Sequence, residues 1–190
     1  MTGVGGIAPQ RLVFLDECGV LTNMVRRYGR SPRGQRARAS VPFGKWRRLS
    51  VLGAIAMDGF MAAMSINAAT DSASFAAYLE QVLLPVLRKR KPDAVLVMDN
   101  LRAHKTDEVQ TVLEKSSFAY RYLPSYSPDP WSASRPKPIE PGWAKVKSDL
   151  RRVAARTVEA LEQALGPALN SITAQDAIGF FRHCGYHCLN

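Results

Sequence analysis

The stretch "VLVMDNLRAHK", residues 95–105, joins a short apolar run to a carboxylate, an amide and an imidazole. A run of this length bounded by polar residues is typical of a buried strand. In sheets that are sandwiched by helices, chemistry gathers at the ends of strands. We therefore interpret residues 95–98 as a buried strand that delivers Asp99 to a candidate site, with Asn100 and His104 close behind it.

A similar apolar run near the N-terminus also ends on acids. The sequence "RLVFLDE", residues 11–17, closes with Asp16 and Glu17. Successive side chains of a strand point to opposite faces, so we expect only one of the two acids to face a given site. Asp16 has the parity of Leu12 and Phe14, but composition does not say which parity faces the site.

The remaining pattern predicts a mixed sheet flanked by helices. Asp58-Gly59 lies between two apolar runs and predicts a two-residue hairpin turn with positive φ at both positions. Helical spacing begins at Asp71 and again at Thr106, and "FAYRYL", residues 118–123, alternates like a strand. Three helices follow: a basic amphipathic one with an apolar stripe of Trp143, Val146, Leu150 and Val153, and two near residues 157–169 and 173–184. A hairpin followed by crossovers favours an α/β fold with a five-stranded mixed sheet.

Composition limits the classes of protein. A chain of 190 residues with 46% hydrophobic residues is long enough for one core, and we expect one domain. The net charge of +10 favours a polyanionic partner such as nucleic acid. Three cysteines argue against a secreted disulfide framework and fit a reducing cytoplasm. No segment has the pattern of a signal peptide or of a membrane span, so we expect no membrane association.

The positive charge is concentrated between the first and second predicted strands. Residues 18–57 contain no Asp or Glu. Such one-sided charge favours a surface that contacts DNA phosphates over an ordinary solvated face. Trp46 is a candidate for stacking or for the core. The candidate DNA-binding residues here are Arg26, Arg27, Arg30, Arg33, Arg36, Arg38, Lys45, Arg47 and Arg48, with Lys147 and Arg151 on the later basic helix.

Three acids on separate elements form a candidate metal site. Asp16, Asp99 and Glu140 offer the oxygen ligands that Mg²⁺ prefers, although a single acid at a strand end is more often simply solvated. Two such ions, about 4 Å apart, can activate the attacking oxygen and stabilise the leaving one in a displacement at phosphorus. The cluster "HCGYHC", residues 183–188, has zinc-like spacing, but Gly185 fits better as the cap of the last helix.

Several motifs occur in an order that resembles the catalytic half of DDE transposases from mariner-related bacterial insertion sequences. They are "FLDECG", "YGRSPRGQR", "VMDNLRAHK", "LPSYSPD", "PIE" followed by "WAKVK", and "RTVEAL", and they cover nearly the whole chain from Leu12. The resemblance implies a ribonuclease H-like fold and a triad of Asp16, Asp99 and Glu140 that binds two Mg²⁺ ions, with Mn²⁺ able to substitute. Asn100 and His104 match the family's Asp-Asn-x-x-x-His pattern and become auxiliary residues. The implied partners are the terminal inverted repeats and target DNA, in a bacterial cytoplasm.

The chain departs from the family pattern before Glu140. The family has two residues between "SPD" and "PIE", whereas this chain has eight, "PWSASRPK" at residues 130–137. We expect residues 1–10 to be a tail and residues 11–190 the catalytic domain, without a helix-turn-helix module. A separate DNA-binding chain from an upstream reading frame and a homodimer are further expectations.

Two other functions stay open at this point. One is a ribonuclease H or junction resolvase, for which Glu80 is the available extra carboxylate. The other is an inactive DNA-binding remnant of a transposase, which the longer loop before Glu140 favours.

Overall fold

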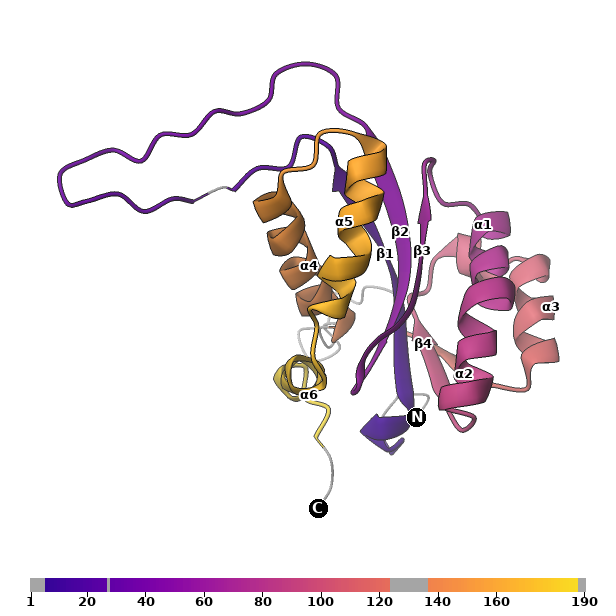
Figure 1. Ribbon diagram of the computed structural model, residues 1–190. Coiled ribbons are helices and arrows are strands. Elements are labelled where there is room, and N and C mark those ends of the chain that lie inside the picture. The colour runs from indigo at the N-terminus through magenta and orange to yellow at the C-terminus, as the bar shows by residue number, and fades with distance from the viewer. Residues whose placement is uncertain (1–5, 27, 124–136, 188–190) are drawn as a thin grey trace, which may run out of the picture.

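A computed structural model describes residues 6–26, 28–123 and 137–187 (Figure 1). The strands are β1 (Leu12–Leu21), β2 (Arg48–Ala56), β3 (Gly59–Ile66), β4 (Val95–Met98) and β5 (Ala119–Tyr122). The main helices are α1 (Ser72–Ala77), α2 (Leu84–Arg90), α3 (Asp107–Ser116), α4 (Ile139–Val153), α5 (Val158–Asn170) and α6 (Ala174–His183). Short helical segments are η1 (Pro9–Arg11), η2 (Tyr78–Leu83) and η3 (Arg102–Lys105).

The strands form one mixed sheet in the order β3-β2-β1-β4-β5. β1 pairs with β2 in the antiparallel direction and with β4 in the parallel direction, so it is the central strand. Phe14 of β1 is the register partner of Val97 of β4. Asp16 and Asp99 each follow two residues later and therefore leave the sheet at the same level. The predicted five-stranded mixed sheet is confirmed.

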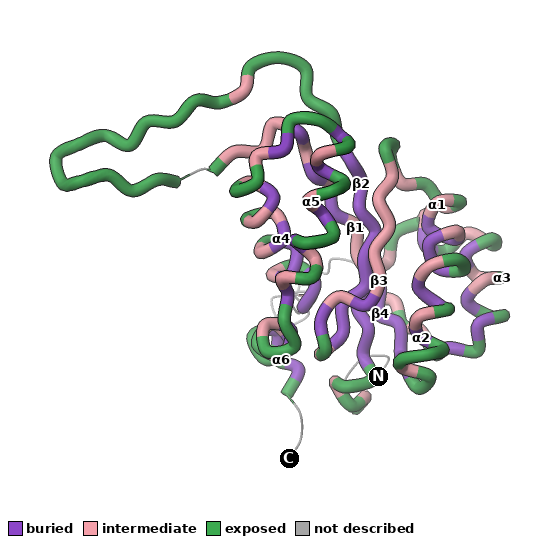
Figure 2. The backbone as a smooth tube through the Cα atoms, viewed as in Figure 1, coloured by how far each residue is buried: buried purple, intermediate pink, exposed green. Residues whose placement is uncertain are grey.

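Helices cover both faces of the sheet and give the molecule three layers (Figure 1). One core holds Leu12, Phe14 and Val97 together with buried side chains of α4, α5 and α6. The other core holds Val13 and Leu15 together with side chains of α1, η2, α2 and α3. Figure 2 shows the buried strands between the two helical layers. Apolar residues of both parities are therefore needed in β1 and β4, which explains their unbroken apolar runs.

The hairpin between β2 and β3 forms as predicted, but the predicted turn type was wrong. Ala56 pairs with Gly59, so Met57 and Asp58 are the central residues of the turn. Of these turn residues only Gly59 has a positive φ, at 112°. The register shifts between Ala54 and Ile55, which shows that a bulge in β3 absorbs one extra residue. A turn with a bulge needs one glycine rather than two positions of positive φ.

The segment from Asp71 to Arg90 is one helical run in three parts. Asp71 caps it by accepting a hydrogen bond of 2.8 Å from the backbone of Ser74. η2 is a π-helical segment, and Pro85 follows it in the first turn of α2. A proline cannot donate to the preceding turn and crowds its carbonyl, so the wider π turn before it relieves that clash. Within the described residues, the helices are too short or too polar to cross a membrane.

Residues 22–26 and 28–47 lie in a long excursion between β1 and β2, which we call the arm. It extends away from the body and is exposed over most of its length (Figures 1 and 2). Its base is closed by the backbone N–H of Arg47, which donates to Oγ1 of Thr22 at 3.0 Å. Arg156, just before α5, donates to the carbonyls of Thr22 and Met24 at 3.1 and 3.0 Å. The base of the arm is thus fixed to the body.

Candidate active site

Asp16 lies on the face of the sheet that α4 covers. Its neighbours of the same parity, Phe14 and Cys18, belong to the core beneath α4, and its partner across the β1/β2 ladder is Gly53. Glu17 has the opposite parity but lines the same groove as Asp16. That only one of the two carboxylates faces the site stays a prediction. β1 pairs with β4 only at residues 12–14, so Asp16 and Glu17 lie beyond the last residue of β1 that pairs with β4.

Asp99 follows β4 directly and is held by His104. Nδ1 of His104 lies 2.6 Å from Oδ1 of Asp99. Burial alone would raise the pKa of Asp99, but the contact with His104, the charge of Lys137 and the backbone of Leu101 together lower it below its ordinary value. Asp99 is therefore held in its ionised form at neutral pH.

His104 is a fixed residue rather than a mobile loop side chain. It is buried, and its ring stacks on Phe75 with a centroid distance of 4.0 Å and an interplanar angle of 22°. The hydroxyl of Tyr122 donates to the backbone oxygen of His104 at 2.7 Å. The structure brings His104 to Asp99, whereas Asn100 follows Asp99 and is half-buried. Sequence spacing alone could not show the stacking on Phe75.

Glu140 lies in the first turn of α4. Its backbone N–H donates to the carbonyl of Lys137 at 2.9 Å. Pro141 follows it in the same turn, where a missing N–H costs no helical hydrogen bond. One turn later Trp143 packs on Phe60, with ring centroids 4.9 Å apart, and over Gly53. Most of the longer loop before Glu140 falls at residues 124–136, outside the described residues, and α4, which carries Glu140, nevertheless packs on the sheet.

A groove of about 380 Å³ runs between β1 and α4. Asp16 and Glu140 line it from opposite sides, and Lys147 and Arg151 continue it along α4. Asp99 is not among the lining residues. The groove therefore carries two acids of the predicted triad beside two cations that could hold a phosphate backbone.

Lys137 is a residue of the site that the sequence did not indicate. Its Nζ donates to Oδ1 of Asp16 at 2.8 Å, and both side chains are largely buried. Burial would lower the pKa of Lys137, but Asp16 and the charges of Asp99 and Glu140 outweigh burial and raise it. All three predicted acids thus act on one ammonium group. A lysine after a proline-rich loop has no spacing that marks it, so only the folded structure reveals its place.

The donor set suits a hard cation. Across residues 6–26, 28–123 and 137–187, no three acidic, histidine or cysteine side chains are placed closely enough to hold a metal ion. The acids nevertheless act together on a positive charge, the Lys137 ammonium. Carboxylate oxygens are the ligands that Mg²⁺ and Mn²⁺ prefer, so the chemistry of Asp16, Asp99 and Glu140 fits such an ion.

The predicted DNA-binding residues fall in two places. Lys147 and Arg151 lie in the groove. Arg27 lies outside the described residues, and the other predicted cations between β1 and β2 are exposed on the arm or at the start of β2. Trp46 is 60% exposed, which excludes the core as its place. On α4, Val153 is also exposed, because it is the last helical residue and lies beyond the α4 stripe that packs on the sheet.

The zinc interpretation of residues 183–188 finds no support among the described residues. Gly185 has φ 81° and donates to Arg182, while Tyr186 donates to Phe181, which is the pattern of a glycine helix cap. Cys184 is buried, and burial together with the charge of Glu140 raises the pKa of its thiol to about 11. The thiolate that zinc binds is disfavoured there. Cys188 lies outside the described residues.

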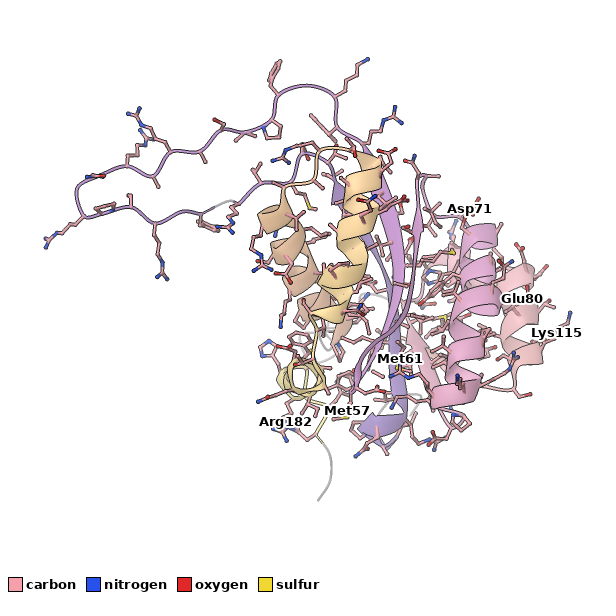
Figure 3. The ribbon with its side chains drawn as sticks, in the orientation of Figure 1. Met57, Met61, Asp71, Glu80, Lys115 and Arg182 are labelled. Carbon is pink, nitrogen blue, oxygen red and sulfur yellow. The ribbon has the colours of Figure 1, made fainter. Side chains whose placement is uncertain are left out.

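Glu80, the extra acid considered for a ribonuclease H, is remote from the groove. It is exposed on η2. Figure 3 shows it in the helical layer on the opposite side of the sheet from α4. An acid in this position cannot share an ion with Asp16 and Glu140, so the structure removes the residue on which that alternative depended.

Solved structures that resemble this chain show its fold, and a family model shows its family. No curated protein matches the chain. A Mos1 transposase paired-end complex with the left transposon end matches with a TM-score of 0.66 at 15% identity, over 93% of this chain and 52% of that one. The catalytic domain of Mos1 mariner transposase matches with a TM-score of 0.63 at 13% identity, over 93% of this chain and 78% of that one.

This chain therefore spans about half the length of the Mos1 chain in that paired-end complex. The likeness shows the same ribonuclease H-like fold. The family model "DDE superfamily endonuclease" matches residues 11–162, which is most of the chain. The chain belongs to the DDE superfamily endonuclease family.

Proposed function

We propose that this chain is the catalytic domain of a DNA transposase that hydrolyses a phosphodiester at the end of an insertion sequence and joins the freed 3′ end to target DNA. The observation that carries the proposal is the groove in which Asp16 and Glu140 lie beside Lys147 and Arg151. The chain's membership of the DDE superfamily endonuclease family supports the same class of reaction.

Asp16, Asp99 and Glu140 are the proposed ligands of two Mg²⁺ ions, for which Mn²⁺ can substitute. Bound there, the ions would supply an activated oxygen nucleophile and stabilise the leaving oxygen. His104 orients Asp99 through the 2.6 Å contact and keeps it ionised. Lys147 and Arg151 bind the backbone of the strand that is cut. Solved structures of Mos1 with Mn and with Mg support the choice of ions.

Double-stranded DNA is the proposed partner. One similar solved structure is a Mos1 transposase paired-end complex with the left transposon end, and another is the Mos1 strand transfer complex; both are 15% identical to this chain, which supports the fold alone. In this chain the support comes from charge, since the arm and the groove both present cations and the net charge is +10. We propose that the groove holds the terminal repeat and that the arm contacts flanking DNA, in a bacterial cytoplasm.

Nicking of a supercoiled plasmid that carries the DNA flanking the gene on both sides tests this function. The wild-type chain should nick it with Mg²⁺ or Mn²⁺ and not with EDTA. Asp99→Asn should abolish nicking and keep DNA binding. Asp93→Asn is the control, because Asp93 pairs with Arg11 at an exposed position outside the groove. Equal nicking by wild type and Asp99→Asn would overturn the assignment.

Two further measurements separate the other two functions. Full DNA binding without nicking under either metal, by a chain whose circular dichroism shows a folded state, would favour the DNA-binding remnant. Preferential cleavage of the RNA strand in an RNA–DNA hybrid would favour a ribonuclease H.

A further inference from the structure

Lys137 places its ammonium group against Asp16, one of the three proposed metal ligands. Its Nζ is 2.8 Å from Oδ1 of Asp16, and its side chain is only 17% exposed. Its backbone carbonyl accepts the N–H of Glu140, so the lysine is tied to the turn that carries the third acid. Asp99, at the same level of the sheet as Asp16, also acts on its charge.

The ammonium and a divalent ion compete for the same negative charge. A cation at Asp16 satisfies the oxygen that a metal would bind, and two cations a few ångströms apart repel each other strongly in a partly buried groove. A lysine has a flexible four-carbon stem and a compact charge, so it can leave Asp16 without a change in the backbone. Neither the sheet nor α4 would need to move.

We propose that Lys137 is an internal counter-ion that occupies the metal position in the free protein and must be displaced before a divalent ion can bind. The inference rests on the proposed metal-dependent function of the same acids. It makes Lys137 a residue that sets the metal concentration at which the site is loaded, rather than a residue that contacts the reacting atoms.

Direct Mn²⁺ binding to the free chain tests the inference. Isothermal titration or electron paramagnetic resonance, without DNA, should show that Lys137→Met binds Mn²⁺ at least tenfold more tightly than wild type. Lys137→Gln is the second variant and should act in the same direction. The matched control is Lys91→Met: Lys91 is 16% exposed and pairs with Asp58 at 3.5 Å, outside the groove. Its removal should leave Mn²⁺ affinity unchanged.

A measurement on the wild-type chain guards against variants that fail to fold. Brief acetylation followed by mass spectrometry reports how accessible each lysine amine is. Acetylation of Lys137 should rise when Mn²⁺ is added, because the metal expels its ammonium from Asp16, while acetylation of Lys91 should not change. Unchanged or reduced acetylation of Lys137 at saturating Mn²⁺ would overturn the inference.

The remaining outcomes separate this inference from the proposed function. In one outcome wild type binds Mn²⁺, Asp16→Asn loses the binding, and Lys137→Met binds no more tightly than wild type. That outcome would support the metal site and overturn the counter-ion role of Lys137. Absence of Mn²⁺ binding in both wild type and Lys137→Met would overturn the metal site and the counter-ion role together.

Discussion

Replacing Gly53 by alanine should disturb the contact that docks α4 against the sheet. Gly53 is the partner of Asp16 across the β1/β2 ladder. A Cβ at this position would lie 2.6 Å from Cη2 and 2.7 Å from Cζ2 of Trp143. Carbon atoms in contact are normally about 3.5 to 4.0 Å apart, so the indole must retreat by roughly 1 Å. Glu140 lies one turn before Trp143, and its carboxylate should move away from Asp16 with the helix.

The size of the effect follows from overpacking. Extra methyl groups in a well-packed core typically cost about 1 to 3 kcal/mol of unfolding free energy. For a chain of this size each kcal/mol corresponds to about 2 to 4 °C in the unfolding midpoint, so Gly53→Ala should unfold at least 2 °C below wild type. A displacement of about 1 Å in a catalytic group can cost a hundredfold in rate. We therefore expect metal-dependent nicking to fall by a factor of about 10 to 100.

Thermal unfolding followed by circular dichroism and the plasmid nicking assay measure the two effects. Gly179→Ala in α6 is the control, because a Cβ there meets nothing within 4 Å and alanine favours a helix by about 0.5 to 1 kcal/mol. Trp143→Leu combined with Gly53→Ala should show a favourable coupling, since the smaller side chain makes room for the methyl group. A Gly53→Ala chain as stable as wild type would refute the docking argument.

Three further predictions concern charge. Hydrogen bonds from Lys145 and Thr173 hold the pKa of Asp176 at about 2. The lowered pKa stabilises the folded chain above the unfolded pKa near 3.8, and this stabilisation is lost as the pH falls toward 2. Asp176→Asn should therefore lower the unfolding midpoint at pH 7 and flatten its decline below pH 4. His104→Phe should raise the pKa of Asp99, because the contact that lowers it is removed, and a carbon-13 titration of the carboxyl group reports the change. Four arginines of the arm should be replaced together by glutamine: Arg30, Arg33, Arg36 and Arg38. The replacement should weaken DNA binding measured by fluorescence anisotropy. Each lost phosphate contact should reduce the slope of log binding constant against log salt concentration by about 0.9.

Each of these predictions has an outcome that contradicts it. Parallel pH profiles for Asp176→Asn and wild type would show that the lowered pKa confers no stability. An unshifted Asp99 in His104→Phe would assign its lowered pKa to Lys137 and the backbone instead. An unchanged salt slope after the arginine replacements would show that the arm does not contact phosphates.

Much of the sheet could be predicted from sequence because its signals are local. β1 and β4 are buried on both faces, so their runs are apolar throughout and stand out against the polar residues that follow. The equal level of Asp16 and Asp99 depends in addition on the register that pairs Phe14 with Val97, which the apolar runs alone do not specify. The glycine cap at Gly185 was also a local signal and is confirmed.

The features that sequence could not predict depend on contacts between distant segments. The predicted turn type after Ala56 was wrong because a bulge shifts the β3 register. Nothing in the sequence "MDGF" distinguishes a turn followed by a bulge from a tight two-residue turn. The residues alone left open whether Asp16 or Glu17 faces the site, because parity does not say on which face of β1 the groove lies. Lys137 was missed because its importance arises from Asp16, 121 residues away in the chain.

The placement of the third acid explains how the chain can depart from its family pattern at residues 130–137. Asp16 and Asp99 are fixed by the sheet, but Glu140 is fixed by the docking of α4, where Trp143 lies against Gly53 and Phe60. The number of residues between "SPD" and "PIE" does not affect the contact of Trp143 with Gly53 and Phe60. A longer connection therefore changes how the chain reaches α4 without changing where α4 packs. By the same argument, the position of Glu140 should tolerate changes in loop length but not a methyl group on Gly53.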